Sequence, residues 1–486
     1  MVAACGGNDH GAADRTARRP ATTTTTSTST TTTTTTASAA AGIGAADVGD
    51  PLSPGSGNGG FDVQHYEVSI DATDPTGSIT VRNEVTAVAT QALRRFDLDL
   101  AGMEVTSVTV DGRPAQHSRV DAELQITPEA PLAEGATFTV VVDYHGVPDP
   151  VLDGSLGEEI GWLRSAAGDT YVVSEPDGAK SFLASSDHPS DKATFTFHLR
   201  VRTGTTAVAN GELKEQRPDG DATMWTWAAA EPMATYLVQV AIGAYEVVDA
   251  GVHDGVDVRH VVLKSLPGTD RRPLDATAEI LSTLSSRFGR YPFPNAGVLV
   301  ADSPDTFALE TQGLVILPSS WFRGRMPDDE TVTVIAHELA HQWFGDWVTP
   351  ARWSDIWLNE GFATWAEWLW SEHLGQGTIV ERADATHPSA VRWRRQFGPV
   401  TSPNALSLFS PNQYGGAGVV VEALRRTLGD QRFDRLLHEW LTRFGGKSAT
   451  TADFEALASE VAGKDLTTFF DAWLRSTDLP PMPPAR

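Results

Sequence analysis

The sequence contains a single cysteine, Cys5, among its 486 residues. One cysteine cannot form an intrachain disulfide, so a disulfide framework is excluded, and any metal site must be built from histidine and carboxylate side chains. The sequence also lacks any run of about 18 apolar residues, which is the length that a membrane-spanning helix needs. We therefore expect no transmembrane helix.

Basic residues are scarce relative to acidic ones. The chain has 37 Lys and Arg against 63 Asp and Glu, which gives a formal net charge of −26. Nucleic acid binding requires a basic surface that neutralises phosphates, so this balance argues against a nucleic acid partner. It also disfavours binding to anionic lipid headgroups, and otherwise indicates a solvated surface.

The first sixty residues have the composition of a stalk. Val2-Ala3-Ala4-Cys5 resembles a bacterial lipobox, and residues 21–40 form a Thr/Ser/Ala tract that cannot bury a core. A charged region and an apolar region should precede the cysteine of a lipoprotein signal, and none stands before Cys5. Either the start codon was assigned too late or the match is accidental. We expect residues 1–60 to be a signal remnant and disordered stalk, with the protein lipid-anchored at the cell envelope through Cys5.

Residues 61–250 alternate apolar and polar side chains with a period of two. This pattern, punctuated by turn dipeptides such as Asp111-Gly112 and Asn210-Gly211, predicts a largely antiparallel β domain with one buried face.

Residues 251–486 show a different pattern, in which helices follow a few strands. They begin with a strand at 256–263, a helix at 275–288 and two β segments at 297–301 and 309–316, and become mainly helical after residue 331. A chain of this length suits more than one domain.

The most informative stretch is His337-Glu338-Leu339-Ala340-His341, an H-E-x-x-H motif within a helical pattern. Residues four apart share one face of a helix, so His337 and His341 can bind one metal ion together. Glu338 is placed to act on a metal-activated water as a general base. Glu360, on a second helix that returns against the first, is the expected third ligand. Three protein ligands leave one open position, which is typical of a catalytic Zn²⁺ site with one ion per chain.

The H-E-x-x-H motif alone would also fit a helix with two incidental histidines and no metal site. The apolar residues around both helices favour the metal site, because a catalytic zinc needs a dry shell. The metzincin pattern is excluded, since Phe344 and Trp347 occupy its required Gly and His positions.

The stretch HELAHQWFGDWVTPARWSDIWLNEGFATW resembles the core of the aminopeptidase N family of zinc metallopeptidases, the gluzincin aminopeptidases. The resemblance extends from about residue 61 to the C-terminus. It implies a multidomain α and β protein, with an N-terminal antiparallel β saddle domain and a thermolysin-like α+β catalytic domain that ends in helices. The chain has no room for the helical C-terminal domains of larger members, so a minimal two-domain form is expected.

The resemblance also implies substrate-binding residues. The family's G-x-M-E-N motif falls on residues 307–311, where Glu310 is kept but Phe307, Leu309 and Thr311 depart from the pattern. Glu310 is expected to hold the amino group of the substrate, with Ala308 beside it, and the substitutions put the shape of the first side-chain pocket in doubt. Glu175, twelve residues before Asp187-His188-Pro189, is expected to be a second amine-binding glutamate.

Tyr414, which precedes a predicted helix at residues 419–428, matches the family's catalytic tyrosine. Its hydroxyl would stabilise the oxyanion while Glu338 moves the proton. Asp355 is a further candidate, expected to orient a zinc-bound histidine. The implied function is hydrolysis of N-terminal residues from peptides with a free amino terminus, by a protein that we expect to be monomeric. The alternatives are an endopeptidase or epoxide hydrolase on the same scaffold, or a surface binding protein with an inactive site.

Overall fold

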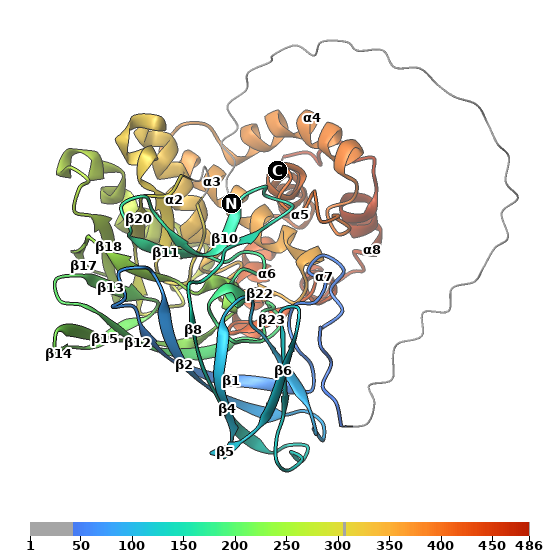
Figure 1. Cartoon of the computed structure of the whole chain (residues 1–486). Helices are drawn as coiled ribbons and strands as arrows, with labels where there is room; N and C mark the ends of the chain where they lie inside the picture. Colours follow the sequence, from blue (N-terminus) through green and yellow to red (C-terminus); the bar gives the residue numbers. More distant parts are fainter. Residues whose placement is uncertain (1–41, 305–307, 486) are drawn as a thin grey trace, which may run out of the picture.

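The structure is a computed structural model that describes residues 42–304 and 308–485. Cys5 and the Thr/Ser/Ala tract lie outside the described residues. Figure 1 shows the β-rich part of the chain in blue and green beside a helical part in yellow to red. Among the described residues, no helix has both the length and the apolar character needed to cross a membrane.

The β-rich half is built on an eight-stranded sheet. Its strands bury alternate side chains, as the period of two predicts, so that one face packs on the core. Neighbouring strands are antiparallel except for β1 and β12, which pair in parallel. In spatial order the strands are β14 (Glu212–Asp219), β15 (Ala222–Met233), β12 (Ala193–Arg202), β1 (Phe61–Asp71), β2 (Ile79–Ala89), β8 (Thr137–Gly146), β4 (Glu104–Val110) and β5 (Arg113–Pro114).

Two smaller sheets complete this half. The five-stranded one contains β13 (Thr206–Ala209), β16 (Val240–Gly243), β11 (Thr170–Val173), β10 (Glu159–Arg164) and β9 (Val151–Leu152). The three-stranded one contains β3 (Phe96–Asp99), β7 (Glu123–Thr127) and β6 (Gln116–Val120). The predicted antiparallel β domain is therefore present.

Residues 42–60 do not behave as the stalk that their composition predicts. Ile43 forms a β-bridge with Arg95, and the Ser56 hydroxyl donates to Asp177 Oδ2 at 2.8 Å. Asp50 is buried, and its Oδ2 accepts a hydrogen bond from the backbone N–H of Trp353 at 2.8 Å. This segment is held by polar groups of both halves of the molecule rather than by apolar burial. The prediction that the disordered stalk extends to residue 60 is therefore wrong for residues 42–60, which pack against the folded protein.

The second half begins with a mixed sheet. β17 (Tyr245–His253) and β18 (Val256–Leu263) are antiparallel, and β18, β20 (Val298–Ala301) and β21 (Val315–Pro318) then follow in parallel, with β19 (Asn295–Ala296) beside β18. The segment expected as a strand at 309–316 is shorter. Leu309 bridges to Ile316, and a turn with Gly313 at φ 72° separates them, so Glu310 stands just before this turn.

Helices form most of the remainder. They are α1 (Thr277–Phe288), α2 (Asp328–His341), α3 (Trp357–His373), α4 (Ile379–Phe397), α5 (Ala417–Leu428), α6 (Asp430–Arg443), α7 (Thr451–Ala462) and α8 (Thr467–Phe470). A short parallel pair, β22 (Val348–Pro350) and β23 (Lys447–Ala449), joins two of the loops. Buried apolar side chains form one cluster that runs through both halves, so the two halves pack as one body.

Candidate metal centre and active site

Helix α2 presents two histidines on one face. Asp328, Asp329 and Glu330 lie in its first turn, where negative charge stabilises the positive end of the helix dipole. His337 and His341 follow one turn apart near its C-terminus, and both are fully buried. The two rings lie 4.7 Å apart, centre to centre.

Glu360 reaches the two histidines from the first turn of α3. Its Oε2 lies 3.3 Å from Nε2 of His337 and 3.6 Å from Nε2 of His341. The possible ligand atoms of the three residues all lie within 4.8 Å of one another. Donors about 2.1 Å from a tetrahedral ion stand about 3.4 Å apart. This nitrogen and oxygen donor set therefore fits one Zn²⁺ ion.

Each histidine has a partner on its other ring nitrogen. Nδ1 of His337 lies 2.5 Å from Oε1 of Glu367, and Nδ1 of His341 lies 3.1 Å from the carbonyl oxygen of Phe344. Such partners fix the ring and leave Nε2 free to face a metal. Burial lowers the pKa of His337, but the carboxylates of Glu360 and Glu367 outweigh it and raise this pKa to about 10. The same two histidines hold the pKa of Glu360 below its usual value against the effect of burial.

The predicted role of Asp355 is wrong. This residue ends a short turn before α3, and its Oδ1 accepts a hydrogen bond from the Thr451 hydroxyl at 2.6 Å. Glu367 holds His337 instead, and sequence reasoning missed it. Its position seven residues after Glu360, on the same face of α3, was the available signal.

Glu338 lies beside the metal-binding group. It is fully buried, and neither carboxylate oxygen has a hydrogen-bond partner among the described residues. A second group of close ligand atoms joins it to His341 and Glu310. Burial raises the pKa of Glu338, and the neighbouring histidines offset only part of this rise. A raised pKa brings the carboxylate of Glu338 closer to the pKa that an effective general base has at neutral pH.

Tyr414 lies in the turn Asn412–Gly416 that leads into α5, as predicted. Its ring stacks on His337 with the centres 6.0 Å apart and the planes at 25°. The ring is half-buried, whereas the hydroxyl is buried without a hydrogen-bond partner in the described part of the chain. Burial and the charge of Glu360 raise the pKa of Tyr414 well above 10, so the hydroxyl keeps its proton and can donate it in a hydrogen bond.

Glu310 and Glu175 bring two more carboxylates to the site. Both side chains are fully buried, and none of their four carboxylate oxygens has a hydrogen-bond partner within residues 42–304 and 308–485. The backbone of Glu310 is fixed, because Nε2 of Gln342 donates to its carbonyl oxygen at 2.9 Å. Burial, followed by the charge of Glu310, raises the pKa of Glu175. Ala308 is buried two residues before Glu310, whereas Phe307 lies outside the described residues.

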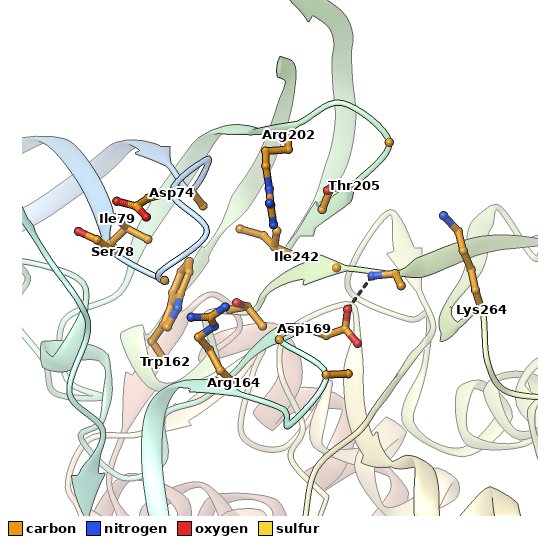
Figure 2. Close-up of a pocket in the computed structure, with 18 residues that line it drawn as sticks. Asp74, Ser78, Ile79, Trp162, Arg164, Asp169, Arg202, Thr205, Ile242 and Lys264 are labelled. Carbon is orange, nitrogen blue, oxygen red and sulfur yellow. Dashed lines mark hydrogen bonds between the residues drawn. The ribbon is translucent and has the colours of Figure 1, made fainter. Parts of the chain in front are cut away.

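A separate cavity of about 240 Å³ lies in the β-rich half (Figure 2). Arg164 and Arg202 point toward it, and Asp169 accepts a hydrogen bond from the backbone N–H of Ala244 at 2.7 Å. None of the predicted site residues lines this cavity. This cavity is therefore distinct from the group of titratable side chains around α2 and α3.

Two family models match the chain. The Peptidase M1 N-terminal domain matches residues 63–237, and the Peptidase family M1 domain matches residues 272–473. Aminopeptidase M1-A of Oryza sativa subsp. japonica is 27% identical over 449 residues, which cover 85% of this chain and 49% of the rice protein. Leucyl aminopeptidase of Saccharolobus solfataricus is 22% identical over 451 residues, with 86% and 54% covered. The chain thus spans about half the length of these curated relatives.

A solved structure matches most of this chain. The M1 zinc metallopeptidase from Deinococcus radiodurans is 31% identical, with a TM-score of 0.81, and the match covers 90% of this chain and 100% of that one. A mutant of the Deinococcus protein bound to a Tyr-Ser-Ala substrate aligns with a TM-score of 0.82. On the two family models and this likeness, the chain belongs to the peptidase M1 family, with a β-rich N-terminal domain and a zinc-binding catalytic domain.

Proposed function

We propose that this protein is a zinc-dependent aminopeptidase that removes N-terminal residues from peptides. The observation that carries the proposal is a pair of buried carboxylates. Glu310 groups with Glu338 and His341, and the charges of Glu310, Glu360 and Glu338 act on the pKa of Glu175. A peptide amino terminus has a pKa of about 8, so it is mostly a cation at neutral pH. Two unpartnered carboxylates form a binding site for such a cation, and they sit next to the metal ligands.

The chain's own residues supply the proton transfer. Zn²⁺, when bound, supplies Lewis acidity that polarises the peptide carbonyl and acidifies water. Glu338 accepts a proton from the attacking water as the new C–O bond forms. It then delivers that proton to the nitrogen of the departing amine as the C–N bond breaks. Its carboxylate has no competing hydrogen-bond partner in the described part of the chain, which leaves it available for both steps.

Tyr414 stabilises the oxyanion. Its buried hydroxyl lies on a ring stacked over His337, and its high pKa keeps it a hydrogen-bond donor. The loss of one such donor typically costs about 10²–10³ in rate. Glu310 and Glu175 fix the position of the amino terminus, so that only the first peptide bond comes between the metal ligands and Tyr414.

The proposal is tested with a tripeptide and its N-acetylated twin. We expect the wild-type enzyme to release the first residue from the free-amine peptide and to leave the acetylated peptide intact, because acetylation removes the cation. Equal cleavage of both peptides would indicate an endopeptidase. No cleavage of either by zinc-loaded protein would indicate another hydrolase activity or a binding protein.

We further propose that the protein is held at the cell envelope by lipid on Cys5. The support is the Val2-Ala3-Ala4-Cys5 sequence and the Thr/Ser/Ala tract after it. One acyl chain gives only marginal membrane binding, so more than one is required. Expression with labelled palmitate should label the wild type but not Cys5→Ser, and an unlabelled wild type would contradict the proposal.

A further inference from the structure

Glu175 lies in a tight turn that follows β11. The backbone N–H of Gly178 donates to the carbonyl oxygen of Ser174 at 2.7 Å and closes this turn, which also contains Asp177. The carboxylate of Glu175 has no hydrogen-bond partner among the described residues. Its position therefore depends on how the rest of the turn is fixed.

Asp177 is held largely by the N-terminal segment. The hydroxyls of Ser53 and Ser56 donate to its Oδ2 at 3.1 and 2.8 Å, and Lys180 Nζ donates to the same oxygen at 2.6 Å. Both serines are buried. Within the described part of the chain, residues 42–60 thus supply two of the three hydrogen bonds that this oxygen accepts.

The segment that carries these serines, residues 50–58, has a fixed seat on the β-rich half. The backbone N–H of Gly57 donates to Oδ2 of Asp99 at 3.0 Å. Gly57 has a φ of 71°, and a Cβ atom on it would lie 2.5 Å from Cβ of His188. Only glycine allows so close an approach, and the contact defines where the two serine hydroxyls lie.

The same segment reaches the helical half through Asp50. Its Oδ2 accepts a hydrogen bond from the backbone N–H of Trp353 at 2.8 Å, in the turn before α3, and Glu360 lies in the first turn of α3. Burial raises the pKa of Glu175, and the charges of Glu310 and Glu360 raise it further, so these carboxylates share one site. One short segment therefore contacts the turn that carries Glu175 and the turn before the helix that carries Glu360.

We propose that residues 50–58 position the active site, because Ser53 and Ser56 hold Asp177 and so set where the Glu175 carboxylate lies relative to the metal ligands. The two serines act through Asp177 and are positioning residues. The inference rests on the proposed aminopeptidase function, in which Glu175 binds the amino group. It gives a role to a segment that precedes residues 63–237, the part matched by the N-terminal family model.

The test compares Ala-Phe-Ala with a des-amino peptide, in which hydrogen replaces the terminal amine, as substrates of the zinc-loaded full chain. We expect Ser53→Ala/Ser56→Ala to lower kcat/KM for the free-amine peptide by about tenfold, mainly through KM, since misplacing a binding group by about 1 Å costs up to about 10²-fold. The value for the des-amino peptide should barely change, because that peptide has no amine for Glu175 to hold. Ser107→Ala, which removes a Ser–Asp hydrogen bond of 2.7 Å in β4, is the matched control and should leave both values unchanged.

Two further measurements test the route through Asp177. Asp177→Ala removes the acceptor of both serines, so adding Ser53→Ala/Ser56→Ala to it should cost nothing further, as expected for groups that share one partner. Hydrogen exchange gives a readout besides activity. The N–H of Gly178, which closes the turn, should exchange faster in the serine double variant than in wild type or in Ser107→Ala. This measurement stands on its own if Asp177→Ala does not fold.

Equal losses on both peptides in the serine double variant would overturn the inference, and so would unchanged kinetics, an unchanged exchange rate of the Gly178 N–H, or losses that add to those of Asp177→Ala. Failure of the proposed function looks different. In that case the wild type itself cleaves neither peptide, or cleaves both equally well.

Discussion

The two sides of the active site differ in how their polar groups are paired. On the metal side, each histidine has a protein partner on its second nitrogen, and Glu360 lies within 3.6 Å of both rings. On the amine side, the carboxylates of Glu175 and Glu310 have no hydrogen-bond partner in the described residues. Buried carboxylates are costly without a counter-charge. The polar groups of the metal side are therefore paired within the protein, whereas under the proposed function the amino group of the substrate pairs with Glu175 and Glu310.

The largest effect should come from Glu338, which stands between the two sides. We expect Glu338→Gln to lower kcat by about 10²–10⁴-fold, because the amide cannot accept the proton. Zinc content should stay at one per chain, measured by atomic absorption, since Glu338 is not one of the proposed ligands. Glu330→Gln, exposed on the same helix, is the matched control. Wild-type turnover in a zinc-loaded Glu338→Gln variant would refute the base role.

Asp50 links the N-terminal segment to the turn just before α3, the helix that carries Glu360. Its Oδ2 accepts from Trp353 N–H at 2.8 Å, just before α3, and lies 3.2 Å from Nε2 of His188. We expect Asp50→Ala to lower the free energy of unfolding by about 2–4 kcal/mol, because buried groups lose a charged partner. Urea unfolding measures this change. Asp47→Ala, at an exposed position nearby, should change it little, and equal losses in the two variants would contradict the assignment.

The carboxylate of Asp50 should also make the stability of the protein depend on pH. Burial raises the pKa of Asp50, but hydrogen bonds from His188 and from backbone N–H groups outweigh it, so the folded-state pKa lies below the ordinary value. The stabilisation by Asp50 is therefore complete above the unfolded pKa of about 3.9 and is lost as the pH falls through the lower folded value. The difference in stability between wild type and Asp50→Ala should shrink over that acidic range.

A smaller effect should come from Glu367, which orients His337. We expect Glu367→Gln to weaken zinc binding by about 10–100-fold, the usual cost of losing a ligand's hydrogen-bond partner. Competition with a chelator measures the affinity directly and is independent of turnover. Glu372→Gln, exposed on the same helix, serves as the control. An unchanged zinc affinity in Glu367→Gln would mean that the metal side does not depend on this support.

The parts predicted from sequence are those encoded by local periodicity. The spacing of His337 and His341 predicts that they share one helix face, and the alternation in residues 61–250 predicts the sheet. Asp355 departs from its predicted role because the turn before α3 directs it toward Thr451, which no spacing reveals. The packing of residues 42–60 depends on Asp177, His188 and Trp353, more than 100 residues away. A cavity of about 390 Å³ beside Tyr414 is likewise not predictable, because α3, α4 and the loop before α5, which line it, meet only in the folded chain.

The central claim is that Glu310 acts on the substrate's amino group, and a double-mutant cycle tests it most directly. Wild type and Glu310→Gln are each assayed, zinc-loaded, on Ala-Phe-Ala and on the same peptide with the terminal amine replaced by hydrogen. We predict that Glu310→Gln lowers kcat/KM for the free-amine peptide by about tenfold or more, the scale of close charge pairs, and barely changes it for the des-amino peptide. Equal losses on both peptides would show that Glu310 does not hold the amine.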